Sequence, residues 1–226
     1  MVALILADGD APTRAQLDGS WRGWADGIDL VIAADGGARH AAGLGVAIDL
    51  WVGDGDSLGE AGLASLRAAG VPIERARPDK DETDTELAVR GALARGAQGL
   101  VIVGALGGPR TDHALANVGL LALADLAGRP TVILEAQARM TLLRAPDVTA
   151  GDARLVLAGR PGDIVSLLPY GGDVVGVATD GLAFPLADEA LALGSTRGVS
   201  NVVQRSGASV TLRRGLLLVI ETPATL

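Results

Sequence analysis

Short runs of apolar residues alternate with longer mixed stretches up to about residue 140. The apolar runs cover residues 2–6, 30–34, 50–52, 100–103 and 131–134, with a weaker run near Ile73. This alternation is typical of parallel strands connected by crossover helices. Because the runs are apolar at successive positions, we expect both faces of the sheet to be buried.

Two of the intervening stretches carry helix signals. Thr83 and Glu86 form the T-x-x-E pattern of a capping box, which predicts a helix that begins there and extends to Arg95. Before residue 131, apolar residues recur at the spacing of one helix face, at Leu115, Val118, Ala122 and Leu126.

The pattern changes after Pro146. Short strand-like runs at 154–157, 164–168, 174–179, 209–212 and 216–220 are separated by Gly, Pro and Asp, which favours a small all-β sandwich or barrel. Ala-Pro-Asp and Ala-Gly-Asp interrupt the apolar pattern between residues 144 and 152. We therefore expect two domains: a mostly parallel, Rossmann-like α/β sandwich over residues 1–145 and a β-sandwich over residues 146–226.

The composition of the 226 residues restricts the class of protein. Hydrophobic residues make up 49% and charged residues 20%, and the mean hydropathy is positive, so we expect a folded chain. The apolar runs are far shorter than the roughly 18 residues of a membrane span, and no basic region precedes the first run as it would in a signal peptide. We therefore expect a cytoplasmic protein that does not enter the membrane.

Charge and residue usage favour a small-molecule substrate. A net charge of −8 and only three Trp, one Tyr and one Phe argue against binding to nucleic acid. The chain has no Cys, which excludes thiolate metal sites and a Cys nucleophile. The only lysine, Lys80, lies in the most acidic stretch. Chance explains that position equally well, but an ammonium group there would suit phosphate oxygens.

Acidic residues follow almost every apolar run. In an open parallel sheet, ligands bind at the carboxyl ends of the strands, so these positions bear on function. The segments concerned are Asp8, Asp35 with Gly36 and Gly37, Asp54-Gly55-Asp56-Ser57, Pro78 to Asp84, and Gly107 to His113. Each acid alone has a structural explanation as a helix N-cap or a turn residue, most clearly Asp112, which stands where the next helix should begin.

Together these acids indicate a cation site, because carboxylates gathered at one sheet edge repel one another. Oxygen ligands without His or Cys favour magnesium, which bridges carboxylates to substrate phosphates. Gly55 has no side chain, so the carboxylates on either side of it can turn toward one ion. We take Asp54 and Asp56 as the first two ligands and Asp84, at the start of the capped helix, as the third.

Phosphate groups also need hydrogen-bond donors. The pairs Gly36-Gly37 and Gly107-Gly108 can present backbone N–H groups at helix N-termini, and Lys80 and Arg110 add positive charge. The sequence contains no G-x-x-x-x-G-K-[ST], and no G-x-G-x-x-G follows the first run. A P-loop ATPase and an ordinary NAD enzyme are therefore disfavoured.

In their order along the chain, these motifs resemble those of the thiamine pyrophosphokinase family. The similar segments are Ala34-Asp35-Gly36-Gly37, Gly53 to Ser57, Asp79 to Asp84, Gly107-Gly108 with Arg110, Asp112, His113, Ala116 and Asn117, Thr179 to Leu186, and Val199-Ser200-Asn201. They extend from about residue 34 to residue 201.

The resemblance implies a magnesium-dependent enzyme that transfers the diphosphate of ATP to the hydroxyl of thiamine, giving thiamine diphosphate and AMP. It also implies a homodimer in which the β-sandwich binds thiamine and each thiamine site is shared between subunits. Asp54, Asp56 and Asp84 would hold magnesium. ATP or the reacting groups would be surrounded by Asp35, Gly36, Gly37, Lys80, Asp81, Thr83, Arg110 and Asp112, and thiamine would contact Phe184, Ser200 and Asn201.

Three positions depart from the family pattern. Gly55 replaces the usual Phe, Pro109 is an extra residue before Arg110, and Phe184 stands where Trp is expected. A smaller ring stacks less strongly on a cationic ligand. Two alternatives therefore stay open: a pyrophosphokinase of the same fold that acts on another hydroxymethyl heterocycle such as a pterin, and a non-catalytic nucleotide or thiamine sensor.

The expected reaction is in-line attack of the substrate hydroxyl on the β-phosphorus of ATP, with AMP as the leaving group. Asp84 or Asp112 could accept or orient the hydroxyl proton.

Overall fold

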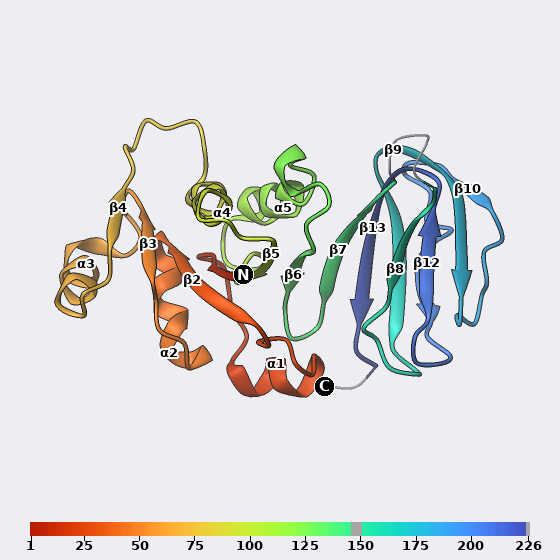
Figure 1. The fold of residues 1–226 in the computed structure, drawn as a ribbon, viewed down its shortest axis with the longest axis horizontal. Coiled ribbons are helices and arrows are strands. Elements are labelled where there is room, and N and C mark those ends of the chain that lie inside the picture. The colour runs from red at the N-terminus through yellow and green to blue at the C-terminus, as the bar shows by residue number, and fades with distance from the viewer. Residues whose placement is uncertain (146–150, 225–226) are drawn as a thin grey trace. The chain divides into compact units, whose positions relative to one another are not determined.

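The chain forms two compact units, Met1–Ala136 and Gln137–Leu226, in a computed structural model that describes residues 1–145 and 151–224 (Figure 1). We expected the boundary after residue 145, in an interrupted stretch whose residues 146–150 lie outside the described part. The division instead precedes β7 (Arg139–Arg144), because this strand pairs antiparallel with β13 (Arg214–Thr222). Its alternation of polar and apolar residues did not stand out in the sequence.

The first unit contains a parallel sheet with the strand order β4-β3-β2-β1-β5-β6. Its strands are β1 (Val2–Leu6), β2 (Ile28–Ala34), β3 (Leu50–Gly53), β4 (Ile73–Arg75), β5 (Gly99–Val103) and β6 (Thr131–Leu134). Each apolar run predicted before residue 140 is confirmed as a strand. The fold class predicted for this half of the chain is therefore confirmed.

Helices cover both faces of this sheet. They are α1 (Arg14–Ser20), α2 (Ala41–Leu44), α3 (Gly59–Ala68), α4 (Asp84–Ala94) and α5 (Thr111–Leu120), with 3-10 turns η1 (Asp35–His40) and η2 (Ala124–Leu126). Figure 1 shows α4 and α5 over one face and α1 and α2 over the other. Leu4, Leu6 and Trp51 pack with Leu17 of α1 on one side, while α4 packs against β1, β2 and β3, so the sheet is buried on both faces as predicted.

The predicted capping box forms in part. Thr83 is the N-cap of α4, and its Oγ1 accepts a hydrogen bond from Glu86 N at 3.2 Å. The Glu86 carboxylate bonds instead to Arg90, one turn further along the helix, at 2.9 Å. A single cap bond is enough to start the helix at the predicted residue.

The helix predicted around Leu115 is shorter than its apolar pattern. The structure ends α5 at Leu120, and Ala122 N and Leu123 N then bond to carbonyls three residues back, at Gly119 and Leu120. These are 3-10 bonds, which tighten the chain into η2.

The second unit is antiparallel β-structure, as predicted. Besides β7 and β13 it contains β8 (Ala153–Val156), β9 (Ile164–Asp180), β10 (Glu189–Leu191), β11 (Asn201–Val202) and β12 (Ser209–Leu212). The two strands predicted at 164–168 and 174–179 are one long strand, β9. Its first part pairs with β13 and its last residues pair with β12. Gly171 and Gly176, with φ of 73° and 76°, allow the bends between these partners.

The order of the parallel strands determines where ligands can bind. The chain proceeds outward from β1 through β2 and β3 to β4, and then returns to place β5 on the other side of β1. Loops on the two sides of β1 therefore diverge at the carboxyl end of the sheet and leave a crevice.

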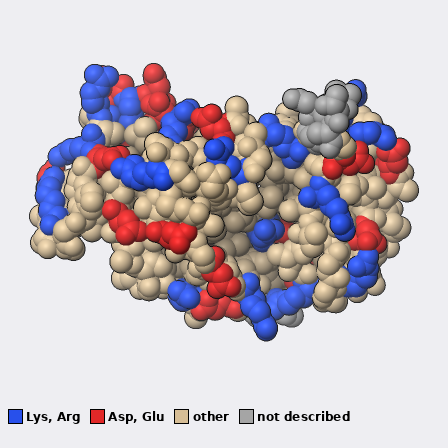
Figure 2. Space-filling view, viewed as in Figure 1, with Lys and Arg blue, Asp and Glu red and all other residues tan. Residues whose placement is uncertain are grey.

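Charged side chains of both signs are interspersed over the face drawn in Figure 2. Arg75 and Glu60 form one exposed ion pair of the first unit, at 2.9 Å. Such pairs contribute little to stability. None of the described helices is long and apolar enough to cross a membrane.

A buried carboxylate stabilises the second unit and gives a first prediction. Glu221 is 1% exposed and accepts hydrogen bonds from Arg139 Nη1 at 2.6 Å and Gly159 N at 2.7 Å. Arg139→Met leaves a buried charge without its cation and should lower the free energy of unfolding by roughly 2–4 kcal/mol. Adding Glu221→Gln should recover part of that loss. Urea denaturation measures both; equal stability of the wild type and Arg139→Met would refute the ion pair.

Candidate functional site

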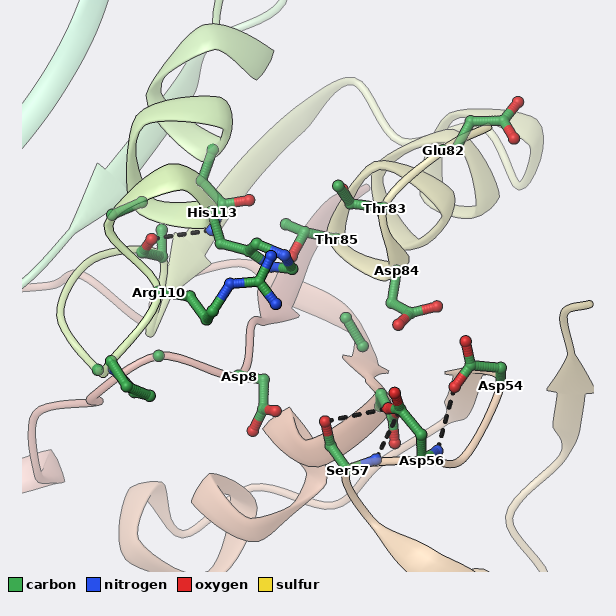
Figure 3. A pocket seen from close by; sticks show the side chains of 18 of the residues that line it. Asp8, Asp54, Asp56, Ser57, Glu82, Thr83, Asp84, Thr85, Arg110 and His113 are labelled. Carbon is green, nitrogen blue, oxygen red and sulfur yellow. Dashed lines mark hydrogen bonds between the residues drawn. The ribbon is translucent and has the colours of Figure 1, made fainter. Parts of the chain in front are cut away.

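A cleft of about 510 Å³ lies at the carboxyl ends of the parallel strands of the first unit. Its walls come from the loops that follow β1, β2, β3 and β5, from the segment before α4, and from the first turns of α4 and α5. This is the crevice that the strand order predicts. Figure 3 shows acidic side chains converging on it, with Asp54 and Asp84 facing each other and Asp56 beside Ser57.

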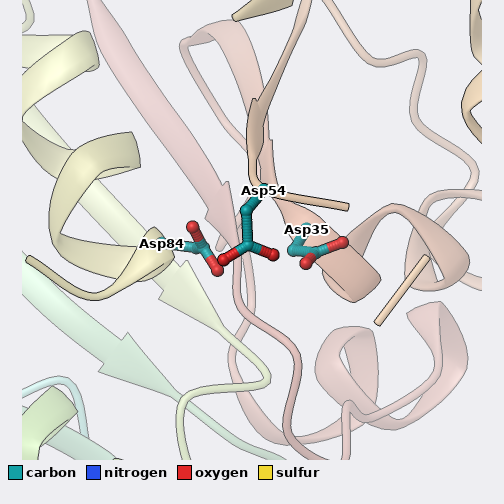
Figure 4. Close-up of side chains that lie close together, drawn as sticks. All are labelled: Asp35, Asp54 and Asp84. Atoms are coloured by element: carbon teal, nitrogen blue, oxygen red, sulfur yellow. The ribbon is translucent and has the colours of Figure 1, made fainter. Parts of the chain in front are cut away.

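Three carboxylates meet in this cleft. One oxygen from each of Asp35, Asp54 and Asp84 lies within 4.8 Å of the other two (Figure 4). The residues come from the ends of β2 and β3 and from the start of α4. The sheet thus brings together side chains that are far apart in the sequence.

Asp35 is the most enclosed of the three, with an exposed fraction of 2%. Its Oδ1 accepts a hydrogen bond from Leu58 N at 3.0 Å and its Oδ2 one from Ser57 N at 3.3 Å. Its backbone has a φ of 40°, a strained conformation for a residue with a side chain. Burial raises the pKa of Asp35 to about 6, against the lowering effect of the two backbone donors.

Asp54 is oriented by a tight turn. Its Oδ1 accepts a hydrogen bond from Asp56 N at 3.1 Å, across Gly55. Gly55 has a φ of 88°, and a Cβ there would lie 2.9 Å from Leu63 Cδ1. The glycine therefore fits a left-handed turn packed against α3, and this local geometry explains why a large side chain is absent from the position.

Lys80 lies between two of the acids. Its Nζ is 2.9 Å from Asp54 Oδ2 and 2.9 Å from Asp84 Oδ1, and all three side chains are less than one quarter exposed. Burial opposes the charged ammonium, but the contacts with Asp54 and Asp84 raise the pKa of Lys80 overall. The hydrogen bond from Lys80 lowers the pKa of Asp54. The lysine thus neutralises part of the charge that the acids bring together.

Asp84 is held by an ionic contact rather than by a hydrogen bond of good geometry. Burial raises its pKa, and the charges of Asp54 and Asp56 act in the same direction, against the contact with Lys80. Its Oδ1 is buried and has no hydrogen bond of good geometry, only the ionic contact with Lys80. Together with the oxygens of Asp35 and Asp54, the Asp84 carboxylate forms a set of oxygen donors that suits a hard cation such as magnesium.

The three-acid group differs in one member from the ligands predicted from the sequence. Asp54 and Asp84 belong to both sets, but Asp35 takes the third place instead of Asp56. Asp56 lines the same cleft, and its Oδ1 accepts a hydrogen bond from Ser57 Oγ at 3.2 Å. The Asp56 side chain also contacts the carboxylates of Asp35 and Asp54, so it lies beside the three-acid group.

Arg110 and Asp112 are paired with each other. Arg110 Nε and Nη2 donate to the two carboxylate oxygens of Asp112 at 2.9 and 2.7 Å. This pairing lowers the pKa of Asp112. Arg110 lines the cleft, whereas Asp112 is exposed in the first turn of α5 and is not the N-cap of that helix. With a lowered pKa, Asp112 is a weak base.

The other predicted nucleotide residues divide into two groups. Lys80, Thr83 and the pair Gly107-Gly108 line the cleft. Asp81, which is exposed, and the buried pair Gly36-Gly37 are not part of its wall. Gly37 packs against the end of β1, where a Cβ would lie 2.1 Å from Leu6 O. Close packing of the backbone therefore explains this glycine without a phosphate contact.

The residues predicted to contact thiamine lie in the second unit. Phe184, Ser200 and Asn201 line a separate cavity of about 300 Å³ together with Arg197 and Val199. Phe184 and Val199 are exposed at 67% and 43%.

Asn201 is committed to the fold of this cavity. It is buried, and it bonds to both Phe184 N and Phe184 O, at 3.0 and 2.6 Å. These bonds position the Phe184 backbone and use both ends of the amide side chain.

Sequence reasoning missed two charged residues that do not line the cleft but bond to the loops around it. Arg39, from η1, donates hydrogen bonds to Asp8 and to Ser57 O. Glu135, after β6, accepts a bond from Leu106 N at 3.4 Å, and burial raises its pKa to about 7. The one signal available for Glu135 was its position directly after β6, because acids also follow most of the other parallel strands.

Comparison with known proteins identifies the family. The family model described as "Thiamin pyrophosphokinase, catalytic domain" matches residues 23–133, and the model described as "Thiamin pyrophosphokinase, vitamin B1 binding domain" matches residues 154–217. The chain belongs to the thiamin pyrophosphokinase family. Together the two matches cover most of both units, and the first one contains Asp35, Asp54 and Asp84.

Individual relatives agree with this assignment. The chain is 24% identical to the thiamine pyrophosphokinase of Bacillus subtilis over 200 residues, which are 88% of this chain and 90% of the relative. Crystal structures from Bacillus subtilis and Geobacillus thermodenitrificans are 25% and 26% identical, with TM-scores of 0.81 and 0.79; they cover 99% and 100% of this chain and 99% of their own. The Candida albicans enzyme, at 13% identity and a TM-score of 0.75, shares the fold. It covers 98% of this chain and 90% of its own length.

The position of Lys80 leads to a prediction about stability. Lys80→Met leaves the carboxylates of Asp54 and Asp84 without their cation and should lower the free energy of unfolding in EDTA by roughly 1–3 kcal/mol. Added Mg²⁺ should restore part of that loss. Arg77→Met is the control, because the Arg77–Asp79 pair is about four-fifths exposed and should contribute little. Equal stability of the Lys80 and Arg77 variants in EDTA would refute the stabilising role of Lys80.

Glu135 leads to a prediction about pH. Its folded-state pKa of about 7 lies above the ordinary value of 4.5, so ionisation of Glu135 costs folding free energy. That cost is absent well below pH 4.5 and complete above pH 7. Glu135→Gln should therefore be more stable than the wild type at pH 8, by roughly 1–3 kcal/mol, and the difference should shrink at pH 5. Denaturation curves at the two pH values measure it, and a difference independent of pH would contradict the raised pKa.

Proposed function

We propose that this chain is an ATP-dependent diphosphotransferase that converts thiamine to thiamine diphosphate and releases AMP. The observation that carries the proposal is the convergence of Asp35, Asp54 and Asp84 in one cleft of the unit that matches the catalytic model. Such a group of acids can hold a cation against the phosphates of a nucleotide.

Thiamine is favoured over a pterin as the acceptor. The vitamin B1-binding model covers residues 154–217, and this range contains the cavity residues Phe184, Ser200 and Asn201. Phe184 presents an exposed ring at that cavity, which suits the face of a cationic heterocycle.

The acid group is proposed to hold magnesium through Asp54, Asp84 and Asp35, with Asp56 as a further oxygen donor beside them. The donor set fits the ion because it offers only carboxylate oxygens, three of which lie within 4.8 Å of one another. A bound magnesium ion would stabilise negative charge on the phosphate oxygens of ATP.

The remaining cleft residues are proposed to position the reacting groups. Lys80 and Arg110 offer positive charge to phosphate oxygens, and Thr83 offers a hydroxyl at the start of α4. Of the two carboxylates considered as proton acceptors, Asp84 has the raised pKa and Asp112 the lowered one. Because a ligand of magnesium is a poor free base, Asp84 is proposed only to orient the attacking hydroxyl and not to accept its proton.

The proposal extends to assembly and location. We place the enzyme in the cytoplasm, where ATP is available, as a homodimer whose thiamine sites are shared between subunits. Phe184 and Val199 are exposed apolar side chains at the thiamine cavity, and this supports the proposal that a second subunit contacts that surface.

The experiment that tests the function is an AMP-release assay with ATP, Mg²⁺ and thiamine. The wild type should release AMP with thiamine and much less with a hydroxymethylpterin. Asp54→Asn and Asp84→Asn should lower kcat at least 100-fold, because each removes a ligand charge, and Asp56→Asn should lower it less.

Asp152→Asn, at an exposed position of the second unit, is the control and should retain wild-type activity. Thermal melting should show that each variant is folded. Binding of nucleotide and thiamine without AMP release would favour a sensor, and normal turnover in a folded Asp54→Asn would overturn the site assignment.

A further inference from the structure

The segment Asp8-Gly9-Asp10, directly after β1, contacts both glycine pairs that the sequence singled out. β1 pairs with β2 on one side and with β5 on the other. The loop after β1 therefore lies between the turn that carries Asp35 and the loop that leads to Arg110. Different residues of the segment make the contacts on the two sides: Asp10 with the loop after β5, and Asp8 with Arg39 of η1.

Asp10 binds the loop after β5. Its Oδ2 accepts a hydrogen bond from Gly108 N at 2.8 Å, and a Cβ on Gly107 would lie 2.9 Å from the same oxygen. The N–H of Gly108, which the sequence suggested for a phosphate, is thus already bonded to a carboxylate. Asp10 is exposed and is not part of the cleft wall, whereas Gly107 and Gly108 are. Any effect of Asp10 on a ligand must therefore pass through this loop.

Gly9 brings the two backbones into direct contact. Its N donates to Gly104 O at 2.8 Å, and a Cβ at Gly9 would lie 2.5 Å from Leu106 O and 2.6 Å from Gly104 O. Only glycine fits between these carbonyls. The Gly9 bond holds the start of the loop after β5 at Gly104, and the Asp10 bond holds the same loop at Gly108.

Asp8 binds the opposite side. Its carboxylate accepts a hydrogen bond from Arg39, which also donates to Ser57 O at 3.1 Å. A Cβ on Gly36 would lie 2.1 Å from Asp8 Oδ1. Asp8 thus contacts η1, which begins with Asp35, and is connected through Arg39 to the loop after β3.

We propose that Asp8-Gly9-Asp10 is a positioning segment that holds the Gly107 to Arg110 loop at a fixed distance from the three-acid group, with Asp10 as the positioning residue for the nucleotide phosphates. Arg110 follows Gly108 by two residues. Gly107 and Gly108 both have φ near 75°, and glycine residues have a wider range of backbone conformations than other residues. The Asp10 bond restrains this pair, so that Arg110 is presented to the phosphates without first having to be ordered. The inference rests on the proposed function.

The test compares Asp10→Ala with Asp10→Asn in steady-state kinetics. Asp10→Ala removes the acceptor and should raise KM for ATP about three- to tenfold, the effect of one net hydrogen bond. KM for thiamine should change less than twofold. Asp10→Asn keeps an oxygen acceptor of the same length and should restore KM for ATP to within about twofold of the wild type. Asp152→Ala is the matched control at an exposed aspartate.

A second measurement does not depend on turnover. Amide hydrogen exchange of residues 104–110 in the free protein should be faster in Asp10→Ala than in the wild type, and Asp10→Asn should reverse the change. Wild-type AMP release decides the proposed function by itself; once that activity is present, the Asp10 variants decide this inference. Unchanged exchange and unchanged KM for ATP in Asp10→Ala would overturn it, and so would an Asp10→Asn variant as impaired as Asp10→Ala.

Discussion

The repulsion among the carboxylates in the cleft is the constraint on which the rest of the site depends. Asp35, Asp54 and Asp84 place oxygens within 4.8 Å of one another, partly removed from water. Like charges at that distance are held together only by compensating partners. The structure supplies Lys80 between two of them and two backbone N–H groups for Asp35. The buried Oδ1 of Asp84 has the contact with Lys80 but no hydrogen bond of good geometry.

The fold tolerates this arrangement because its other parts hold the acids rigidly. Asp35 has a left-handed backbone whose carbonyl accepts a bond from the buried Trp51 Nε1 at 2.9 Å. Gly55 occupies a left-handed turn against Leu63, and Thr83 caps the helix that begins with Asp84. Each acid is therefore fixed by a strand end or a helix start. Strain at such positions is expected where a function requires a defined geometry.

The sequence was sufficient to predict the parallel strands of the first unit and most of the longer strands of the second, but not every element or contact. Continuous apolar runs predicted each parallel strand, and the rule that ligands bind at carboxyl ends of strands led to the right loops. Spacing along the chain favoured Asp56 as a ligand, whereas the three acids that lie within 4.8 Å of one another include Asp35, from the buried turn after β2. The magnesium ligands themselves stay a prediction. Strand β7 was missed because its burial depends on pairing with β13, more than seventy residues later. The Asp10–Gly108 and Asp8–Arg39 contacts likewise join distant residues, which no local pattern reveals.

Calorimetric titration of Mg²⁺ in the presence of a non-hydrolysable ATP analogue tests the central claim most directly, because it measures cation binding without requiring catalysis. The account predicts that replacing Asp35, Asp54 or Asp84 by Asn weakens Mg²⁺ binding at least tenfold, while the same change at Asp152 leaves it unaltered. Wild-type affinity for Mg²⁺ in folded Asp54→Asn and Asp84→Asn proteins would contradict it.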